Sequence, residues 1–149
     1  MREQAVQAID ALRTEGRRVT TARRLVVELL ARTAEHLTAD ELAVRIHAEH
    51  PEVHLSTVYR TLESLGEWGL VEHVHQPHGP SFFHLAGAHG HLVCEACGCI
   101  RDVPAAEFDA LVARIREQYG FELQVGHAAL AGRCSQHAQE AACTSPTDT

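Results

Sequence analysis

The apolar residues among the first seventy positions recur every three or four residues, a period typical of amphipathic helices. The first stripe comprises Ala5, Ile9 and Leu12. Gly16 follows it and favours a helix end, and either Thr20 or Thr21 can cap the next helix. The second stripe comprises Leu25, Val26, Leu29 and Leu30. Short polar turns separate these helices, as expected in a compact bundle.

Two more helices are predicted before residue 70. Residues 38–41, Thr-Ala-Asp-Glu, have the pattern of a capping box, and Leu42 and Ile46 lie four residues apart behind it. Pro51 lies beyond the expected end of this third helix, and Ser56 can cap a fourth.

After Gly69 the pattern changes to short strands. Residues 70–75 (LVEHVH) and 81–85 (SFFHL) read as two strands joined by a turn through residues 76–80. Helices followed directly by a two-stranded hairpin are typical of a winged helix-turn-helix domain. This domain is expected to cover residues 1–86.

A second, smaller region follows. It is predicted to contain strands at residues 91–94 and 99–103, a helix from about 104 to 119, and a last strand through 121–132. This α/β region, residues 87–137, has little core of its own, so a metal or a partner subunit is expected to complete it. Residues 138–149 are expected to be a disordered tail. The predicted fold class is therefore α+β.

The fourth helix has the features of a DNA reader. Its apolar positions fall within about 60° of one another on a helical projection; they are Val58, Leu62 and Leu65. Tyr59 and Arg60 point the other way, where arginine can contact guanine or phosphate and tyrosine can pack on a thymine methyl. The alternative is an ordinary amphipathic helix. The hairpin and the arginine cluster described next favour DNA.

Composition and charge sharpen this picture. The chain has 149 residues, of which 45% are hydrophobic and 22% charged, which suits one soluble domain or two small ones. The net charge of −7 belongs to residues 61–149, whereas residues 1–60 contain nine arginines and nine acids. All thirteen basic residues are arginine, and four of them lie within residues 17–24 with no acid among them. Such a cluster is either a solvated helix end or a phosphate-binding patch.

The chain shows neither a signal peptide nor an apolar run of membrane-spanning length, so we expect no membrane partner and a cytoplasmic protein. In that reducing compartment, five cysteines favour metal ligands over disulfides.

Cysteine spacing predicts a structural zinc site. A Cys-x-x-Cys-Gly sequence brings two thiolates to one tetrahedral ion, although redox pairs share this spacing. A second half-site occurs forty residues later. The predicted ligands are Cys94, Cys97, Cys134 and His137, with Cys143 as the alternative fourth ligand. Cys99 is left over.

Twelve histidines are unusual for this length. His89 with His91 and His73 with His75 are each two residues apart, which on a strand places both imidazoles on one face about 6.5–7 Å apart. That spacing suits a shared metal. The solvated histidines are expected to be His47, His50, His54 and His78. No acidic pair, nucleophile–base arrangement or phosphate loop accompanies them, so an enzyme has little support.

Taken together, these residues resemble the ferric uptake regulator (Fur) family of metal-dependent repressors. The matching motifs are, in order, GRRVT, HLTADEL, STVYRTLESL, HGHLVCEACG, YGFE, GH and GRC, and they span about residues 10–137. The resemblance implies a winged-helix DNA-binding domain, a dimerisation domain, and a homodimer that binds a palindromic double-stranded operator when loaded with metal.

The resemblance also implies roles for individual residues. Tyr59 and Arg60 would face the major groove, and Arg18 would reach toward the minor groove. The full expected DNA-binding set is Arg17, Arg18, Arg23, Ser56, Thr57, Tyr59 and Arg60. Ala22 replaces the proline that usually begins the helix.

The family's regulatory metal site lies between the two domains. Its matching positions are His36, His84, His89, His91 and Asp102. Iron-type members usually have an acid where His84 stands, and the HHDH motif of their auxiliary site is incomplete around Ala88 and Gly90.

An imidazole-rich site with at most one carboxylate favours Ni²⁺ or Zn²⁺ over Fe²⁺ or Mn²⁺. His73, His75 and His127 resemble the extra site of nickel-responsive members. Zinc-responsive members generally have a cysteine in the sensing site, and no cysteine falls there in this chain, but Glu72 could be a ligand in a zinc-type arrangement. An iron- or peroxide-responsive repressor is the alternative within the family.

Two alternatives come from other classes. A zinc-buffering protein without DNA binding would explain the histidines but not STVYRTL. A zinc enzyme would need a general base, for which Asp102 and Glu72 are the candidates.

Overall fold

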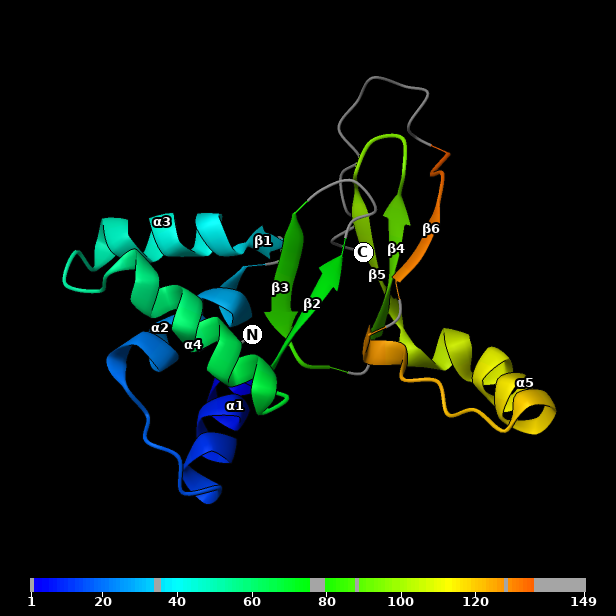
Figure 1. Ribbon diagram of the computed structural model, residues 1–149, viewed down its shortest axis with the longest axis horizontal. Coiled ribbons are helices and arrows are strands. Elements are labelled where there is room, and N and C mark those ends of the chain that lie inside the picture. Colours follow the sequence, from blue (N-terminus) through cyan, green and yellow to red (C-terminus); the bar gives the residue numbers. More distant parts are fainter. Residues whose placement is uncertain (1, 34–35, 76–79, 88, 128, 136–149) are drawn as a thin grey trace. The chain divides into compact units, whose positions relative to one another are not determined.

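The computed structural model describes residues 2–33, 36–75, 80–87, 89–127 and 129–135. These residues form an α+β protein with two compact units (Figure 1). The described residues of the first unit are 2–33, 36–73 and 80–86, and those of the second are 74–75, 87, 89–127 and 129–135. The predicted domain boundary after residue 86 therefore coincides with one of these divisions. The predicted tail lies outside the described residues.

Four helices and a small sheet build the first unit (Figure 1). The helices are α1 (Arg2–Thr14), α2 (Thr21–Arg32), α3 (Ala39–Glu49) and α4 (Leu55–Glu67). The strands β1 (Leu37–Thr38), β2 (Val71–His75) and β3 (Ser81–Leu85) are arranged in the order β1-β3-β2, and the last two residues of β2 are grouped with the second unit. Helix α2 packs against α1, α3 and α4. The helices and hairpin predicted from the apolar pattern are confirmed.

One continuous core holds this unit together. Its fully buried side chains include Leu12, Val26, Leu42, Val58 and Leu65. Each such side chain stabilises the fold by about 1.5–3 kcal/mol through burial of apolar surface. The face of α4 that packs into this core, with Val58 and Leu65, is the face predicted from the sequence to be buried.

Two of the three predicted helix caps are confirmed. The Thr20 side chain accepts a hydrogen bond from the backbone N–H of Arg23 at the start of α2. At the start of α3, Thr38 and Glu41 form the full capping box. The backbone N–H and the hydroxyl of Thr38 donate to the Glu41 carboxylate and lower the pKa of Glu41 below its ordinary value.

The expectation that Ser56 caps α4 is wrong. The helix begins at Leu55, and its N-cap is His54, whose side chain makes no capping hydrogen bond. A preceding turn, in which the N–H of Val53 donates to the carbonyl of His50, buries Val53 and sets an earlier start for the helix. Ser56 consequently lies exposed in the first turn of α4.

Strand β1 was not predicted from the sequence. It has two residues, too few for an alternating pattern, and is held by pairing Leu37 with Phe83 and Thr38 with Phe82 of β3. Leu37 is buried in the core.

The second unit is built on a three-stranded sheet with the order β5-β4-β6. Its elements are β4 (His89–Cys94), β5 (Ile100–Pro104), the 3-10 turn η1 (Ala105–Phe108), α5 (Asp109–Tyr119), the 3-10 turn η2 (Val125–His127) and β6 (Ala129–Gly132). Strand β4 pairs antiparallel with β5 and parallel with β6. Helix α5 ends at Gly120, which takes the left-handed conformation typical of a C-cap.

The predicted last strand over residues 121–132 is wrong in its first half. Only Ala129–Gly132 forms a strand, preceded by the turn η2. Strand β4 has six residues, and its pairing with β6 begins with His91 opposite Ala129 and ends with Cys94 opposite Gly132. In this register β4 has no residues left to pair with residues 121–124.

Candidate functional site

Four cysteine sulfur atoms gather at the end of β4. Cys94 closes β4, Cys97 and Cys99 lie in the following turn, and Cys134 follows β6. Their Sγ atoms all lie within 4.8 Å of one another, and those of Cys97 and Cys134 are 3.6 Å apart. A tetrahedral zinc ion with Zn–S bonds of about 2.3 Å separates its sulfur ligands by about 3.8 Å. This donor set therefore fits a structural zinc ion.

The backbone of this turn prepares Cys94 for metal binding. The N–H of Cys94 donates to the carbonyl of Cys99, and the N–H of Gly98 donates to the carbonyl of Cys94. Gly98 has φ +72°, a conformation that favours glycine and permits the reversal. Hydrogen bonds from the backbone N–H of Cys134 above all, and of Cys97, lower the pKa of the Cys94 thiol to about 6. Cys94 is consequently mostly thiolate at neutral pH, the form that binds zinc.

The structure thus brings together three of the predicted zinc ligands and adds one that the sequence left over. Cys99 comes back toward Cys94 because Gly98 reverses the chain between them. A glycine between two cysteines was the signal for this in the sequence. The predicted fourth ligand His137 and its alternative Cys143 lie outside the described residues.

In the first unit, His36 and His84 lie near each other; we refer to them as the wing histidine pair. The antiparallel register of β1 and β3 pairs Leu37 with Phe83, so its next step places His36 opposite His84. The two ring centroids are 6.4 Å apart. Nδ1 of His84 donates to the Leu85 carbonyl at 2.9 Å, which leaves Nε2 as the ring atom able to bind a metal.

In the second unit, His89 and His91 lie on β4 with ring centroids 4.9 Å apart; together with Asp102 they form what we call the β4 site. The register of β4 and β5 places Asp102 directly opposite His91. Nδ1 of the fully buried His91 donates to the half-exposed Asp102 carboxylate at 3.0 Å. This hydrogen bond fixes the tautomer in which Nε2 of His91 can bind a metal.

Gly90 separates the two histidines for a steric reason. A Cβ atom at this position would lie 2.8 Å from the ring atoms Cε2 and Cζ of Phe108 and 3.2 Å from Cγ1 of Val125. Phe108 is buried, so its ring has little space to move. The backbone of β4 therefore packs closely on the interior.

Replacing Gly90 with alanine is expected to destabilise the second unit by about 1–3 kcal/mol through overpacking. Chemical denaturation of the zinc-loaded protein measures this change. Gly132→Ala is the matched control, because a Cβ atom at that position meets nothing within 4 Å. Equal stability of the two variants would contradict the predicted clash.

The nickel-type set predicted from the sequence lies only partly within the described residues. His73 belongs to the first unit and His75 to the second, and both are exposed. The ring of His73 lies 5.8 Å from that of Phe83. The side chain of His127 lies outside what the structure describes. Glu72, the sequence candidate for a further ligand, has a fully buried Oε2 atom.

Helix α4 presents the surface predicted to read DNA. Val58, Leu62 and Leu65 are buried, as predicted, and Thr61 is buried with them. The predicted reading residues Ser56, Thr57, Tyr59 and Arg60 are all exposed.

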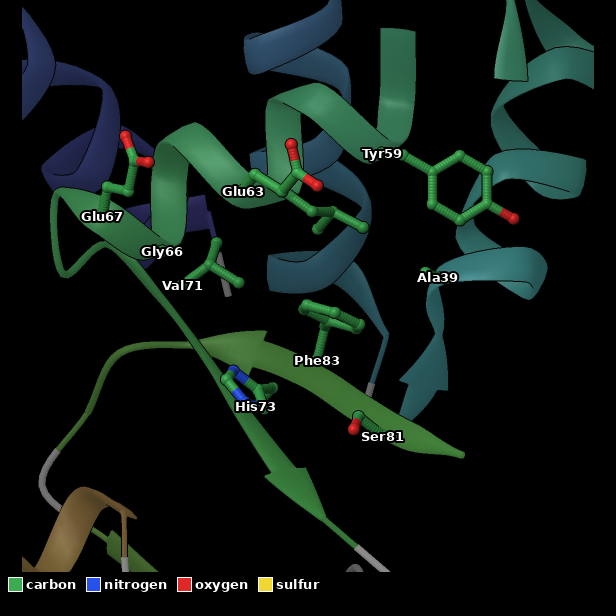
Figure 2. Close-up of a pocket in the computed structure, with 10 residues that line it drawn as sticks. Ala39, Tyr59, Glu63, Gly66, Glu67, Val71, His73, Ser81 and Phe83 are labelled. Carbon is green, nitrogen blue, oxygen red and sulfur yellow. The ribbon is translucent and has the colours of Figure 1, made fainter. Parts of the chain in front are cut away.

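A cavity of about 500 Å³ lies between α4 and the hairpin, and Tyr59 is one of its lining residues. Figure 2 shows Val71 and Phe83 facing α4 across this cavity, with Glu63 and Glu67 on the helix above. These two carboxylates make the hairpin side of α4 negative, which disfavours phosphate there. The side carrying Ser56 and Arg60 is therefore the better surface for DNA.

Tyr59 connects two helices. Its hydroxyl donates to the carboxylate of Asp40 in the first turn of α3, and this hydrogen bond raises the pKa of Tyr59 above its ordinary value. The residue remains 37% exposed, so part of the ring stays available to an apolar partner such as a thymine methyl.

The predicted arginine cluster spans the segment between α1 and α2 and the first turn of α2. The side chain of Arg18 is exposed, whereas Arg17 and Arg23 are half-buried. Arg17 Nε donates to Glu15 at 2.8 Å, and the Arg23 guanidinium donates to the carbonyl of Arg18.

Within the described ranges, no helix has the length and apolar character needed to span a bilayer.

Comparisons with known proteins agree with the resemblance carried by the motifs. The ferric uptake regulator family model matches residues 14–130.

Two relatives and one solved structure illustrate the similarity. The zinc uptake regulation protein of Mycobacterium tuberculosis is 33% identical over 123 residues, covering 80% of this chain and 94% of the relative. The ferric uptake regulation protein of Vibrio anguillarum is 32% identical over 129 residues, covering 85% of this chain and 87% of the relative. The structure of the ferric uptake regulator of Helicobacter pylori superposes on this chain with a TM-score of 0.73 at 20% identity. The match covers 94% of this chain and 95% of that structure, which shows the same fold. The chain belongs to the ferric uptake regulator family of metal-responsive transcriptional regulators.

Proposed function

We propose that this protein is a zinc-responsive repressor that acts in the cytoplasm as a homodimer on a palindromic operator. The observation that carries the proposal is α4, a helix whose apolar face is sealed in the core while Ser56, Thr57, Tyr59 and Arg60 are exposed on it. Such a helix beside a hairpin is the arrangement with which winged-helix proteins enter the major groove. The protein would regulate transcription by binding, without catalysis.

The regulatory site in this proposal draws on the wing histidine pair and the β4 site. His84 and His91 each have Nδ1 committed to an oxygen acceptor, so each can offer Nε2 to a metal. A site of imidazole ligands, in which the Asp102 carboxylate orients His91, suits Zn²⁺ better than Fe²⁺ or Mn²⁺. A bound divalent ion would tie these imidazoles together and favour the conformation that binds DNA.

Zinc is preferred over nickel because a relative that covers most of this chain is named a zinc uptake regulation protein. Nickel remains the comparison metal in the test below.

The homodimer is supported by apolar surface on the second unit. None of the residues of α5, Asp109–Tyr119, is buried. The large apolar side chains exposed on this unit are Leu92, Leu111, Tyr119, Phe121 and Leu130. A second copy of the chain would cover such surface and complete a core that is small on its own.

The experiment titrates labelled genomic operator fragments with protein whose cysteine cluster already holds zinc. Separate titrations contain added Zn²⁺, Ni²⁺, Mn²⁺ or Fe²⁺. Zinc is expected to raise operator affinity by about 5–150-fold, the usual range of allosteric coupling. A larger response to Ni²⁺ would identify a nickel regulator. A protein that binds zinc but no DNA would be a buffer, and the repressor proposal would fail.

Arg60→Ala is expected to weaken operator binding by about 5–150-fold, because one bidentate base contact contributes about 1–3 kcal/mol. Its zinc content should stay at the wild-type level, since Arg60 lies exposed on α4 in the other unit from the cysteine cluster. Fluorescence anisotropy and elemental analysis measure the two quantities. Arg32→Ala, at the far end of α2, is the control and should bind as wild type.

A further inference from the structure

Two arginine side chains stack on the chain's single tryptophan. The guanidinium carbon of Arg17 lies 4.2 Å from the centroid of the Trp68 ring, and that of Arg23 lies 4.6 Å from it. Arg17 precedes α2, Arg23 lies in its first turn, and Trp68 is the C-cap residue of α4. The ring therefore joins the arginine cluster to the end of the helix that carries the exposed Arg60.

Trp68 is a firm support for these cations. It is half-buried and packs against the core of the first unit. Its backbone N–H donates to the carbonyls of Ser64 and Gly66 at the end of α4. A guanidinium over an indole face is attracted by the ring quadrupole, most strongly among the aromatic residues for tryptophan. The ring thus restricts two long side chains that would otherwise sample many rotamers.

Further hydrogen bonds hold the same arrangement. The Arg23 guanidinium donates to the carbonyl of Arg18, which is a neutral acceptor. Arg17 has a carboxylate partner in Glu15, and both of those side chains are accessible to solvent. The segment from Arg17 to Arg24 contains four arginines and no acid. Two cations share one ring here, and among the described residues Glu15 is the carboxylate that pairs with one of them, which leaves a net positive site.

Such a site suits an anion with several oxygen atoms. Like charges held on one ring repel, and a phosphate beside them relieves that repulsion. Planar guanidinium groups bind phosphate oxygens in a bidentate manner, and orientation in advance lowers the entropy lost on binding. Phosphate contacts of this kind fix the register of a reading helix on the duplex without reading sequence.

We propose that Trp68 is a positioning residue that holds Arg17 and Arg23 as a clamp for the DNA backbone next to α4. The proposal rests on the proposed function and adds a residue that no motif of the sequence singled out. Trp68 acts through the two guanidinium groups and does not itself read a base. The simpler alternative is that the stack only fastens the segment between α1 and α2 to the core.

The test uses the full-length zinc-loaded protein and its Trp68→Leu variant, which keeps apolar packing but removes the ring face. Operator and non-specific duplex affinities are measured by anisotropy over a range of salt concentrations. Both are expected to fall about three- to tenfold by the same factor, with a shallower dependence of log affinity on log salt. Trp68→Phe, which retains a ring, is expected to restore most of the affinity.

A double-mutant cycle separates positioning from simple packing. In a background with Arg17→Ala and Arg23→Ala, Trp68→Leu is expected to change DNA affinity less than twofold. Melting temperatures of all variants report any loss of stability. An unchanged salt dependence in Trp68→Leu, or an undiminished effect in the background without the two arginines, would overturn the clamp.

The non-specific duplex makes this test independent of the regulatory mechanism. If no metal changes operator affinity, the proposed function fails while the salt-dependent binding of non-specific DNA still measures the clamp. Trp68 fluorescence adds a direct signal, because it is the single tryptophan of the chain. Binding of either duplex should alter this emission in the wild type, because phosphate then lies beside the guanidinium groups stacked on the ring, and an unaltered emission at saturation would contradict phosphate binding at this site.

Discussion

Replacing Cys94 with serine is expected to abolish the bound zinc and unfold the second unit. Among the described residues of this unit, the buried apolar side chains are few, namely Val74, Val93, Cys94, Ile100 and Phe108. A core of that size contributes little stability on its own, whereas structural zinc contributes about 10–16 kcal/mol in small zinc-binding peptides. Elemental analysis, circular dichroism and size-exclusion chromatography measure zinc content, folding and dimer content. A dimer of normal zinc content and melting temperature would disprove the structural-zinc assignment.

Variants of the other candidates identify the fourth ligand. Cys99→Ser is expected to lower zinc affinity, because the Cys99 sulfur lies within 4.8 Å of the other three. His137→Ala tests the ligand predicted from spacing. If His137→Ala loses zinc while Cys99→Ser keeps it, the sequence assignment holds and Cys99 is a neighbour of the site rather than a ligand.

Local patterns predicted most of the elements because each depends on residues near in sequence. The capping box at Thr38 and Glu41 is complete within four residues, and the buried stripe of α4 follows from helical geometry alone. The prediction that Ser56 caps α4 was wrong because the start of this helix depends on the turn that buries Val53. Residues 121–124 have strand-like composition, but β4 is too short to pair with them.

The metal-binding groups were predicted less completely because they depend on strand register. The spacing of His89 and His91 places both on β4, and the structure agrees. The approach of His36 to His84 follows from the short strand β1, which no pattern revealed. The hydrogen bond between His91 and Asp102 likewise requires the β4–β5 register, which is fixed only in the folded sheet.

Replacing His91 with alanine is expected to reduce operator affinity in zinc to the metal-free level. His91 is fully buried and its tautomer is fixed by Asp102, so its loss removes an oriented ligand. Anisotropy titrations with and without zinc measure the effect, and the structural zinc content checks that the cysteine cluster persists. Metal-independent DNA binding should remain, since the residues of α4 are untouched.

Asp102→Asn separates ligand orientation from ligand loss. An amide at this position weakens the hydrogen bond to Nδ1 of His91 without emptying the space beside it, and partners of this kind usually change metal affinity by about 10–100-fold. The zinc titration should therefore shift to higher concentration and still reach the wild-type end point, which His91→Ala cannot reach. His50→Ala is the control, because that histidine lies between α3 and α4 and pairs with Glu52. A fully zinc-responsive His91→Ala protein would move the sensing role to His73, His75 and His127.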